Sequence, residues 1–502
     1  MSRVFTERRL SIAPIASGQG WLSGMERLPH GTVVSGARLG CLPGQCNSRI
    51  AIWEREDPMI RLLTGLAAAC LLAACSEPAA GDAQEHKADA TMAKNTAEVP
   101  APTPGAVDPV TGIALPEGFV ATVFARDVGF VRHLAVRADG VVYGALRRMQ
   151  DGGGIVALAD DDGDGVADRS AYFGDRAGTG LAIHDGYLYF SSDTEILRYR
   201  LGPDLVPAGA PETIVSGFPS QRQHATKPMT FDDAGNMYVT VGAPSNACQE
   251  RMRTPGSPGL DPCPQRELQA GIWRFDANRP GQVHGKDGAR IATGIRNGLA
   301  IDWNASAGAL YFATHGRDQL GQLFPEYYTA AESAELPAEE FHRVVPGGDY
   351  GWPYTYWDPQ RGARMKAPEY GGDGKTVAEA GKYQEPLVGF PAHWAPNDLV
   401  FYEGEDFPEE YRHGAFIAFH GSWNRAPRPQ EGYNVSFVPM TAAGEVAGPW
   451  RIFADGFKGK AVLASPGDAA HRPSGLAVGP GGALFIGDDK AGWIWKVRHA
   501  GS

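Results

Sequence analysis

One pattern recurs six times between residues 133 and 489 of this chain, and it limits the folds that the chain can adopt. Each copy has an apolar strand, a turn of Gly or Asp, and a second strand with Leu-Tyr or an equivalent pair. The copies read HLAVRADGVVYGAL, LAIHDGYLYFSS, MTFDDAGNMYVTVG, LAIDWNASAGALYFAT, LVFYEGEDFPEEYRHGAFIAF and LAVGPGGALFIGDD. An apolar pair with a Gly turn precedes each copy, and a third apolar strand follows it. The sequence therefore predicts an all-β protein, a six-bladed β-propeller of four-stranded antiparallel blades.

The predicted propeller spans residues 115–498, and its last blade is completed from the other end of the body. The chain ends on the third strand of that blade, so we expect FVATVFA at 119–125 to supply the fourth strand and close the ring. The chain has 65 Gly among 502 residues, roughly twice the usual share of about 7%, which many turns between short strands would require. A two-sheet sandwich or two smaller domains is the alternative architecture.

The stretch MIRLLTGLAAACLLAACSEPAA, residues 59–80, has the layout of a secretory signal. Its unbroken apolar run is about 14 residues long, whereas a bilayer span needs roughly 20. It ends in Leu-Ala-Ala-Cys at 72–75, which resembles the bacterial lipobox, and Ser76 fits sorting to the outer membrane. We expect a lipoprotein signal peptide at 59–74 and an exported protein, anchored through lipidated Cys75 on the periplasmic face of the bacterial outer membrane. A chance alanine-rich helix is the alternative.

Two further segments precede the predicted propeller. Residues 1–58 hold seven Arg and no Lys and show no periodic apolar face. We interpret them as upstream DNA translated from too early a start, which makes Met59 the expected first residue. Residues 75–114 are rich in Ala, Pro, Glu, Asp and Thr. Because they contain hardly any large apolar residue, they cannot bury enough surface to offset their ordering entropy, and a disordered tether is expected.

Charge and repeat position together point to a ligand. The formal net charge of −12 argues against nucleic acid as a partner. In a propeller, the loops that lead into the innermost strands and out of the second strands gather around one mouth of the central channel. In this chain those loops carry Arg132, His133, His224, Lys227, Arg296, Asn297, His315, Arg317, Asp318, His420, Arg425 and Arg472. Each residue alone is more simply explained by a surface or structural role, but a buried group of cations is costly unless an anion fills it.

The body resembles the soluble quinoprotein sugar dehydrogenases, the glucose and sorbosone dehydrogenase family. The resemblance covers about residues 115–498 and rests on HATKPMTFDDAGNMYVTVG, TGIRNGLAID, THGRDQLGQLFP, AFHGSWNR and HRPSGLAVGPGGALFIGDD. The sorbosone dehydrogenase branch is more similar than the glucose branch. The resemblance implies a six-bladed propeller that binds pyrroloquinoline quinone (PQQ) and Ca²⁺ and oxidises a sugar, or a related aldehyde or alcohol, by hydride transfer to PQQ.

The same resemblance implies roles for individual residues. His224 matches the general base, which takes the proton from the substrate hydroxyl. Arg296 and Asn297 match the pair that holds the quinone oxygens and stabilises charge on the reduced ring. Arg472 matches the first of two last-blade arginines that clamp a cofactor carboxylate.

The resemblance also implies a metal site, and at some positions this sequence differs from the family pattern. Gly316 and Arg317 match the backbone carbonyls that bind the cofactor's Ca²⁺, with Asp318 as a side-chain helper. Ser474 stands where the second last-blade arginine is expected, and residues 421–423 replace a lysine. We expect the lost charge to be restored by other cofactor-binding residues, namely Lys227, His420 and Arg425.

A second metal site is predicted in ADDDGDGVADRS. Asp160, Asp162, Asp164 and Asp168 follow a spacing in which alternate carboxylates converge on one ion, and Gly165 permits the sharp turn. The segment lies between strands and lacks the bidentate Glu of an EF-hand. A structural Ca²⁺ site and a solvated acidic turn are the two interpretations.

Two cysteines, Cys248 and Cys263, lie in the folded body, in a loop rich in Pro and Gly. In an exported protein such a pair is best explained as a disulfide. The chain has no Cys-x-x-Cys-His motif for covalent haem, so electrons would leave to an external acceptor, a cytochrome or a quinone.

Three functions remain open from the sequence. The first is the PQQ-dependent dehydrogenase with a small sugar or aldehyde substrate. The second is a Ca²⁺-dependent hydrolase of the lactonase type, which would hold its metal with Glu, Asn and Asp side chains. The third is a non-catalytic binding propeller.

Overall fold

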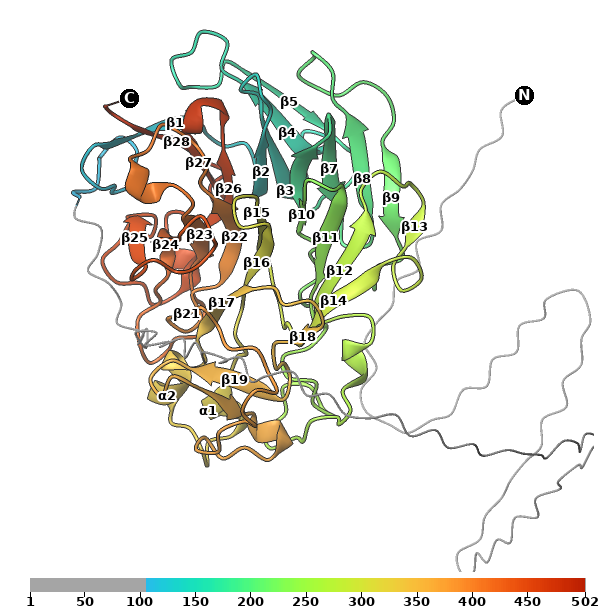
Figure 1. Ribbon diagram of the computed structural model, residues 1–502. Coiled ribbons are helices and arrows are strands. Elements are labelled where there is room, and N and C mark those ends of the chain that lie inside the picture. The colour runs from blue at the N-terminus through green and yellow to red at the C-terminus, as the bar shows by residue number, and fades with distance from the viewer. Residues whose placement is uncertain (1–104, 502) are drawn as a thin grey trace, which may run out of the picture. The chain divides into compact units, whose positions relative to one another are not determined.

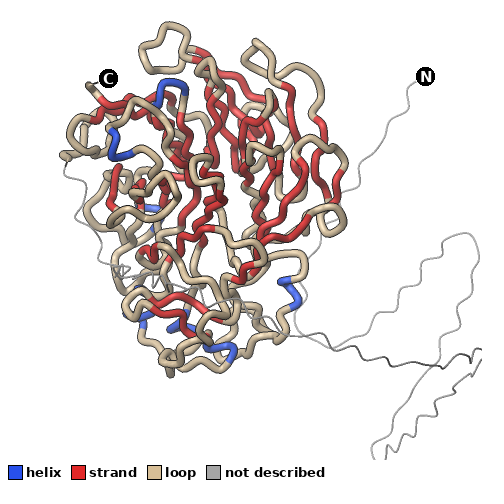
Figure 2. The backbone as a smooth tube through the Cα atoms, viewed as in Figure 1, coloured by secondary structure: helices blue, strands red, loops and turns tan. Residues whose placement is uncertain are grey.

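The computed structural model describes residues 105–501, which form a six-bladed β-propeller (Figure 1). Strands make up most of the regular structure, with a few short helices (Figure 2). Each predicted repeat is a separate antiparallel sheet, and the six sheets follow one another along the chain. The predicted fold is therefore confirmed, and neither the sandwich nor the two smaller domains are found.

The first half of the body builds three blades. The first contains β2 (Val131–Val136), β3 (Val142–Gln150), β4 (Gly153–Ala159) and β5 (Arg169–Phe173). The second contains β6 (Leu181–His184), β7 (Tyr187–Ser191), β8 (Ile196–Arg200) and β9 (Glu212–Ser216), with β13 (Gln282–Val283) added in parallel. The third contains β10 (Met229–Phe231), β11 (Asn236–Val241), β12 (Gly271–Asp276) and β14 (Ala289–Thr293), with β18 (Gly348–Asp349) added in parallel.

The second half builds the other three blades. The fourth contains β15 (Ala300–Asn304), β16 (Ala309–Thr314), β17 (Glu339–Arg343) and β21 (Val388–Phe390). The fifth contains β22 (Pro396–Phe401), β23 (Ala415–His420), β24 (Tyr433–Val438) and β25 (Arg451–Ala454). The sixth contains β26 (Pro473–Val478), β27 (Leu484–Asp488), β28 (Ile494–His499) and β1 (Phe119–Ala125).

Blade four carries an insertion, which lies at the lower edge of Figure 1. It has two parts: α1 (Leu320–Leu323) and α2 (Ala330–Glu335) lie between β16 and β17, and a hairpin of β19 (Thr355–Asp358) and β20 (Ala363–Lys366) lies between β17 and β21. A capping box formed by Thr329 and Glu332 starts α2. Short 3-10 helices occur at Pro264–Arg266, Pro368–Tyr370, Glu409–Tyr411, Pro466–Asp468 and Pro480–Gly482.

The ring closes without a covalent link. Strand β1 pairs antiparallel with β28, with Val123 opposite Trp495 and Val120 opposite Arg498. The innermost strands β2, β6, β10, β15, β22 and β26 each contact the next around the axis. The expected closing strand is thereby confirmed.

Buried carboxylates join neighbouring blades near the axis. Asp302 accepts a hydrogen bond from the hydroxyl of Thr230 (3.1 Å) on one side and from the amide of Phe401 (2.9 Å) on the other. Asp398 accepts from the amide of Leu476 at 2.8 Å. Burial raises the pKa of Asp302 to about 7. These bonds fix each blade against the next, so the loops at the mouth start from fixed positions.

The folded body begins earlier than predicted. Ile113 is buried, and Ala114 pairs with Asp455 of blade five through two backbone hydrogen bonds of 2.9 and 3.0 Å. The indole of Trp495 donates to the carbonyl of Thr111 at 2.9 Å. The described residues of the predicted tether, 105–114, therefore end in a segment that docks on the propeller, because they do contain apolar side chains that pack.

Three predictions fall outside the described residues. These are the upstream extension at 1–58, the signal peptide at 59–74 and lipidation of Cys75. Within residues 105–501, no helix has the length and apolar character needed to cross a membrane.

Candidate active site

Two buried carboxylates organise the charged side chains at the mouth of the channel. Asp318 follows β16 of blade four and Asp489 follows β27 of blade six, so both occupy loops that leave the second strand of a blade. Each collects arginines from other parts of the chain. We define the Asp318 cluster as Asp318, Asn246, Arg253, Arg296 and Asn424. We define the Asp489 cluster as Asp489, Arg132, Arg147, His420 and Arg472.

The Asp318 carboxylate is fully engaged. Its Oδ2 lies 2.8 Å from Nη2 of Arg296 and 3.0 Å from Nη2 of Arg253, and its Oδ1 accepts from Nδ2 of Asn424 at 2.8 Å. Burial alone would raise the pKa of Asp318. The charges of Arg296, then of His393 and Arg253, outweigh burial and hold that pKa well below its usual range.

Arg296 is held in place from two sides. Its Nε donates to the carbonyl of Asn246 (3.2 Å) and its Nη2 to the side-chain oxygen of Asn246 (3.0 Å). Asn246 is itself fixed by donating to the carbonyl of Asp318 (3.0 Å) and by accepting from the indole of Trp352 (2.9 Å). Among the described residues, Nη1 of Arg296 has no hydrogen-bond partner. The guanidinium is therefore rigid and keeps donors for a ligand.

His224 presents an unprotonated ring nitrogen. Its Nδ1 lies 2.7 Å from the carbonyl oxygen of Ala243, and because a carbonyl only accepts, Nδ1 carries the proton. Within residues 105–501, Nε2 has no partner. Burial, and then the charge of Arg296, lower the pKa of His224 well below its ordinary value. The ring is therefore neutral at pH 7 and its Nε2 can accept a proton.

Asn297 lies beside His224. A Cβ at Gly242 would come 2.6 Å from Cβ of His224 and 3.2 Å from Oδ1 of Asn297, so glycine leaves room for both side chains. Nδ2 of Asn297 donates to Nδ1 of His315 (3.2 Å), whose Nε2 donates to the carbonyl of Pro396 (2.9 Å). Burial, and then Arg296, lower the pKa of His315 to about 3. A neutral His315 thus orients the Asn297 amide.

The Asp489 cluster holds more cations than one carboxylate can balance. Oδ2 of Asp489 lies 3.1 Å from Nε of Arg132 and 3.8 Å from Nη1 of Arg147. Oδ1 accepts from Nε2 of His420 at 2.5 Å, and Arg472 donates through Nε to the carbonyl of His420 at 2.8 Å. Burial lowers the pKa of His420 to about 4, so the histidine is neutral and the arginines carry the positive charge.

The donors of this cluster fit an anionic ligand. Arg132 and Arg147 share Asp489, and the guanidinium of Arg472 donates to the carbonyls of His420 and Gly421 rather than to a carboxylate. Nε of Arg132 is buried, and its contact with Asp489 lacks hydrogen-bond geometry. Burial lowers the pKa of Arg472, as expected for a cation with too little solvent or counter-charge around it. An anion such as the carboxylates of PQQ would supply the missing charge and acceptors.

Lys227 and Arg425 lie apart from both clusters. Lys227 donates to the carbonyl of Ala225 and lies 5.8 Å from the ring of Phe218, and burial lowers its pKa to about 8. Arg425 pairs with Glu335 of the insertion at 3.1 Å. Neither residue has a hydrogen bond or ion pair with a cluster member in the described part of the chain, so their predicted cofactor contacts have no support here. The repeat pattern predicts where the backbones of Lys227 and Arg425 lie, but it does not predict where their side chains point.

The predicted Ca²⁺ carbonyls belong to a well-anchored segment. The amide of Gly316 donates to Oε2 of buried Glu339 at 2.9 Å, and Arg317 forms an ion pair with buried Glu369 of the insertion. The Arg317 side chain is thus structural, which leaves only its carbonyl for a metal. Burial raises the pKa of Glu339 to about 8. The helper role of Asp318 would require a change of partners, since both its oxygens are engaged.

Residues on the innermost strands of three blades, β2, β22 and β26, contact one another. Nε2 of His133 donates to the carbonyl of Asn397 at 2.9 Å, and Nδ2 of Asn397 donates to Ser474 at 3.2 Å. All three residues are buried. His133 and Ser474 therefore pack in the channel. The second last-blade arginine that the family resemblance leads us to expect would, at position 474, have to fit among these buried side chains.

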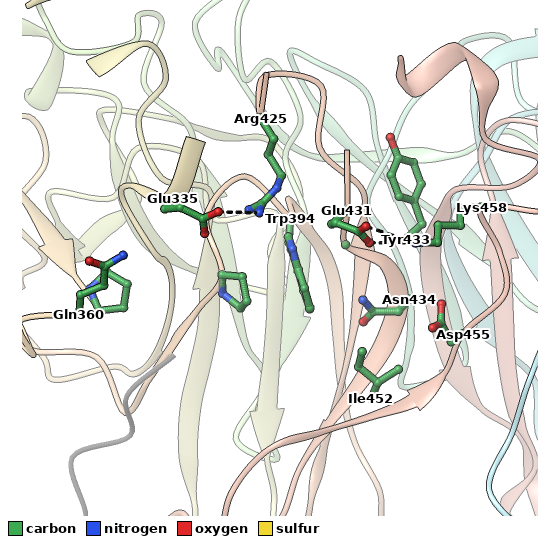
Figure 3. Close-up of a pocket in the computed structure, with 13 residues that line it drawn as sticks. Glu335, Gln360, Trp394, Arg425, Glu431, Tyr433, Asn434, Ile452, Asp455 and Lys458 are labelled. Atoms are coloured by element: carbon green, nitrogen blue, oxygen red, sulfur yellow. Dashed lines mark hydrogen bonds and ion pairs between the residues drawn. The ribbon is translucent and has the colours of Figure 1, made fainter. Parts of the chain in front are cut away.

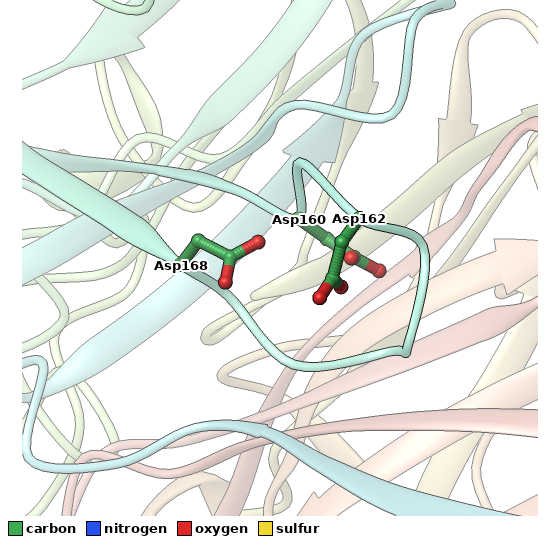
Figure 4. Close-up of side chains that lie close together, drawn as sticks. All are labelled: Asp160, Asp162 and Asp168. Atoms are coloured by element: carbon green, nitrogen blue, oxygen red, sulfur yellow. The ribbon is translucent and has the colours of Figure 1, made fainter.

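Three of the four predicted loop aspartates converge (Figure 4). Asp160, Asp162 and Asp168 each place a carboxylate oxygen within 4.8 Å of the others. Asp164 instead accepts from the amide of Val166 at 2.8 Å. Asp160 also accepts from two backbone amides and lies 3.4 Å from Lys496. Both interpretations, Ca²⁺ site and acidic turn, remain predictions.

A disulfide joins Cys248 and Cys263, as the sequence predicts, and both residues are buried. The loop that it closes contains Arg253, and Asn246 lies two residues before its first cysteine. Both residues belong to the Asp318 cluster. The disulfide-closed loop is therefore part of the site rather than a remote insertion.

Sequence reasoning missed three important groups. Asp489 directly follows the second strand of its blade, and Asp318 and His420 lie at or just after the ends of the second strands of theirs. The repeat therefore indicated that Asp489 would lie at the mouth. Arg253 lies in an irregular insertion, where repeat position gives no guide, and Glu339 is the first residue of β17, which the repeat did not mark as part of the site. Their contacts with Asp318 and Gly316 become visible only in three dimensions.

The fold and the charged loops define a class of protein, a six-bladed propeller with a cluster of arginines at the mouth of its channel. The sequence model of the TrAA12-like family matches residues 113–500, and the chain belongs to this family. This confirms the resemblance to the quinoprotein sugar dehydrogenases. The chain is 34% identical over 114 residues, 20% of its length, to a pyrroloquinoline quinone-dependent pyranose dehydrogenase of Coprinopsis cinerea.

Solved structures share the fold. The PQQ domain of the C. cinerea pyranose dehydrogenase, in its holo form, matches with a TM-score of 0.63 and 20% identity over 79% of this chain and 100% of that one. A calcium structure of the Trichoderma reesei family AA12 enzyme matches with a TM-score of 0.63 and 18% identity over 81% and 99%. The chain spans less than half of the curated relatives that it matches first, 48% of an uncharacterised Borreliella burgdorferi protein and 14% of the pyranose dehydrogenase.

Proposed function

We propose that the protein is a PQQ-dependent dehydrogenase that oxidises a hydroxyl group of a sugar or of a related alcohol or aldehyde. One observation carries the proposal. The unprotonated Nε2 of His224 lies in the same site as the Arg296–Asn297 pair, at the mouth of a propeller with excess arginine. A relative named a PQQ-dependent pyranose dehydrogenase supports the choice of cofactor and of substrate class.

The Asp489 cluster would hold the cofactor's carboxylates. Arg472 and Arg132 offer planar donors that suit bidentate contact with a carboxylate, and Arg147 adds charge from the rim. Bound PQQ would supply an ortho-quinone that accepts a hydride from the substrate carbon. Asn297 and Nη1 of Arg296 would orient the quinone oxygens and stabilise the charge that develops on them.

His224 would act as general base. Its Nε2 would accept the proton of the substrate hydroxyl while Nδ1 stays bonded to the carbonyl of Ala243, which keeps the ring in the right tautomer. The nearby charge of Arg296 keeps His224 unprotonated before substrate arrives. It also makes His224 a weak base, so proton transfer would be coupled to loss of the hydride.

Ca²⁺ would bind at the backbone carbonyls of Gly316 and Arg317. The calcium structure of a family AA12 relative supports this part of the proposal, and Glu339 and Glu369 fix the backbone around the two carbonyls. Oxygen ligands of this kind suit a hard cation.

The hydrolase alternative has less support. A lactonase-type metal would need free side-chain carboxylates on the axis. Asp318 and Asp489 are both engaged by arginines, and Glu339 accepts from the amide of Gly316. A non-catalytic propeller would not need a neutral histidine with an unpaired ring nitrogen close to a buried arginine.

The remaining parts of the proposal concern substrate, electrons and location. We propose a substrate of the sorbosone or glucose type and an external acceptor, a cytochrome or a quinone. We also propose export, with lipidated Cys75 as an anchor on the periplasmic face of the outer membrane. Globomycin treatment, with metabolic labelling by a palmitate analogue in wild type and Cys75→Ala, tests the anchor.

Reconstitution tests the function. The purified protein is titrated with PQQ in Ca²⁺ buffer by calorimetry and then assayed with a panel of aldoses and an artificial electron acceptor. We expect saturable binding and sugar-dependent dye reduction. Absence of both would reject the proposal, and lactone hydrolysis in their place would favour the hydrolase.

A further inference from the structure

A second pocket lies beside the mouth, between the blade-four insertion and the outer strands of blade five (Figure 3). Its volume is about 380 Å³, which is within the range of about 300–1,000 Å³ for small-molecule sites. We call it the blade-five pocket. Its polar and aromatic lining includes Glu335, Gln360, Trp394, Glu431, Asn434 and Lys458.

The blade-five pocket is lined by three carboxylates, Glu335, Glu431 and Asp455, and by two cations, Arg425 and Lys458. Lys458 lies 3.0 Å from Glu431, and Arg425 lies 3.1 Å from Glu335. Arg428, which is not part of the lining, also lies 2.7 Å from Glu335. The pocket therefore has no surplus positive charge with which to select an anion, in contrast to the Asp489 cluster. It offers donors and acceptors to an uncharged polar ligand.

Two donors of pocket residues have no protein partner within residues 105–501, and one of them is a buried atom. The indole Nε1 of Trp394 is buried without a hydrogen bond, in a residue that is 3% exposed. Oδ1 of Asn434 accepts from Ser436 at 2.9 Å, which leaves its Nδ2 without a hydrogen-bond partner among the described residues. A buried donor without a partner, such as the Trp394 indole, is uncommon in folded proteins and costly to leave unpaired. A ligand hydroxyl would satisfy it.

The backbone is shaped to keep the Trp394 ring in place. Gly432 has a φ of 87°, and a Cβ there would lie 2.3 Å from the indole ring of Trp394. Only glycine can therefore pass over the ring at this point. The ring, with Tyr433 and Ile452, gives the pocket an apolar surface beside its polar groups. A sugar ring has this combination of a C–H face and a hydroxyl edge.

The pocket and the mouth share one loop. The segment 421–432 carries Asn424, which donates to Asp318 at the mouth, and Glu431, which lines the pocket. Tyr433 lines the pocket as well, and its ring centre is 5.7 Å from Cζ of Arg472 in the Asp489 cluster. A ligand longer than one sugar could thus reach from one site towards the other.

We propose that the blade-five pocket is a carbohydrate subsite that binds an uncharged glycosyl unit, so that the enzyme takes oligosaccharides as well as single sugars. The choice of a sugar as ligand rests on the proposed function. The pocket itself rests on its lack of surplus positive charge, the unpaired indole of Trp394 and its aromatic lining.

Calorimetric titration of the purified protein with maltotriose and cellotriose, without PQQ, tests the subsite. Trp394→Phe removes the N–H donor and keeps an aromatic ring, and Gln360→Ala changes an exposed residue with no cost to the core. Lys286→Ala on blade three is the matched surface control. We expect saturable binding of at least one trisaccharide, an affinity loss of about tenfold in each pocket variant and no change in the control.

The outcomes separate this inference from the proposed function. Equal affinities in wild type and both pocket variants, or no saturable binding of either trisaccharide, would overturn the subsite. If dye reduction with single sugars persists in that case, the proposed function stands alone. If trisaccharides bind in the pocket but no sugar reduces the dye with PQQ present, the subsite stands and the proposed activity fails. Gln360→Ala should also raise KM for an oxidised trisaccharide and leave KM for a single sugar unchanged.

Discussion

Oδ2 of Asp318 lies 2.8 Å from Nη2 of Arg296, and both side chains are almost fully buried. This ion pair joins the loop that leaves blade four's second strand to the loop that enters its first. Arg253, from the disulfide-closed loop, shares the same oxygen at 3.0 Å. The positions of Arg296 and Arg253 therefore depend on the Asp318 carboxylate, even if a bound ligand makes no contact with it.

Asp318→Asn should destabilise the protein strongly. Removing one partner of a buried ion pair costs about 3–5 kcal/mol, because the other charge is left uncompensated. We expect a loss of this size in the free energy of unfolding, measured with urea. Asp287→Asn breaks an exposed pair with Arg279 (3.3 Å) and should cost less than about 1 kcal/mol. Equal small losses in the two variants would contradict the role given to Asp318.

His224→Ala should reduce turnover by about 10²- to 10⁴-fold, the usual contribution of a general base, and leave PQQ affinity largely intact. The wild-type rate should depend on unprotonated His224. Because burial and Arg296 lower its pKa, the acid limb of the kcat/KM profile, which reports the free enzyme, should lie below the ordinary histidine value of about 6.5. His413→Ala, at an exposed pair with Glu403, is the control. An acid limb at 6.5 or above, or unchanged turnover in His224→Ala, would reject the assignment.

Arg472→Ala and Arg132→Ala should each weaken PQQ binding by about 10- to 100-fold, as expected for loss of a charge-assisted hydrogen bond. Arg472→Lys should recover only part of the loss, since a lysine lacks the planar pair of donors. Calorimetry at two salt concentrations measures both effects. Arg412→Ala, in an exposed pair with Glu409, should bind as wild type. PQQ affinity that is insensitive to both cluster arginines would place the cofactor elsewhere.

Replacing both Cys248 and Cys263 by Ala should lower the free energy of unfolding by about 3 kcal/mol in the chain-entropy model. The loop also positions Asn246 and Arg253, so the variant should lose kcat under conditions in which it is still folded. Steady-state kinetics well below the melting temperature measure this. A variant that is less stable but has wild-type kcat would make the loop a stabilising element only.

Ca²⁺ should raise the melting temperature if the aspartate loop binds it. Asp168→Asn would then remove that part of the rise and leave PQQ-dependent activity unchanged, because the loop lies between β4 and β5 rather than in either mouth cluster. Asp175→Asn, an exposed aspartate that follows β5, is the control. An identical Ca²⁺ response in all three proteins would favour the acidic turn.

The fold could be predicted because each blade repeats a local pattern. Strands such as LAIH and YLYFS carry their apolar residues at positions set by the sheet alone, and the missing fourth strand of the last blade pointed to 119–125. The docking of 111–114 could not be predicted, because it depends on a distant partner, Asp455, rather than on local composition.

The site could be predicted only where repeat position decides it. His224, Arg296 and Asn297 meet because their backbones occupy equivalent loops. Lys227 and Arg425 occupy such loops too, but their long side chains find partners at Ala225 and Glu335. A sequence repeat predicts the position of the backbone, whereas the direction of a long cationic side chain depends on which hydrogen-bond acceptor lies within its reach.

The most direct test of the account is a single-turnover experiment. The protein reconstituted with PQQ and Ca²⁺ is mixed with an excess of a sugar in the absence of any electron acceptor, and the cofactor's absorbance is followed. We predict a rapid change to the spectrum of reduced PQQ, slowed by at least about a hundredfold in His224→Ala although its PQQ content is the same. An unchanged oxidised spectrum with every sugar and aldehyde tested, in protein that demonstrably holds PQQ, would contradict the claim that this propeller is a quinoprotein dehydrogenase.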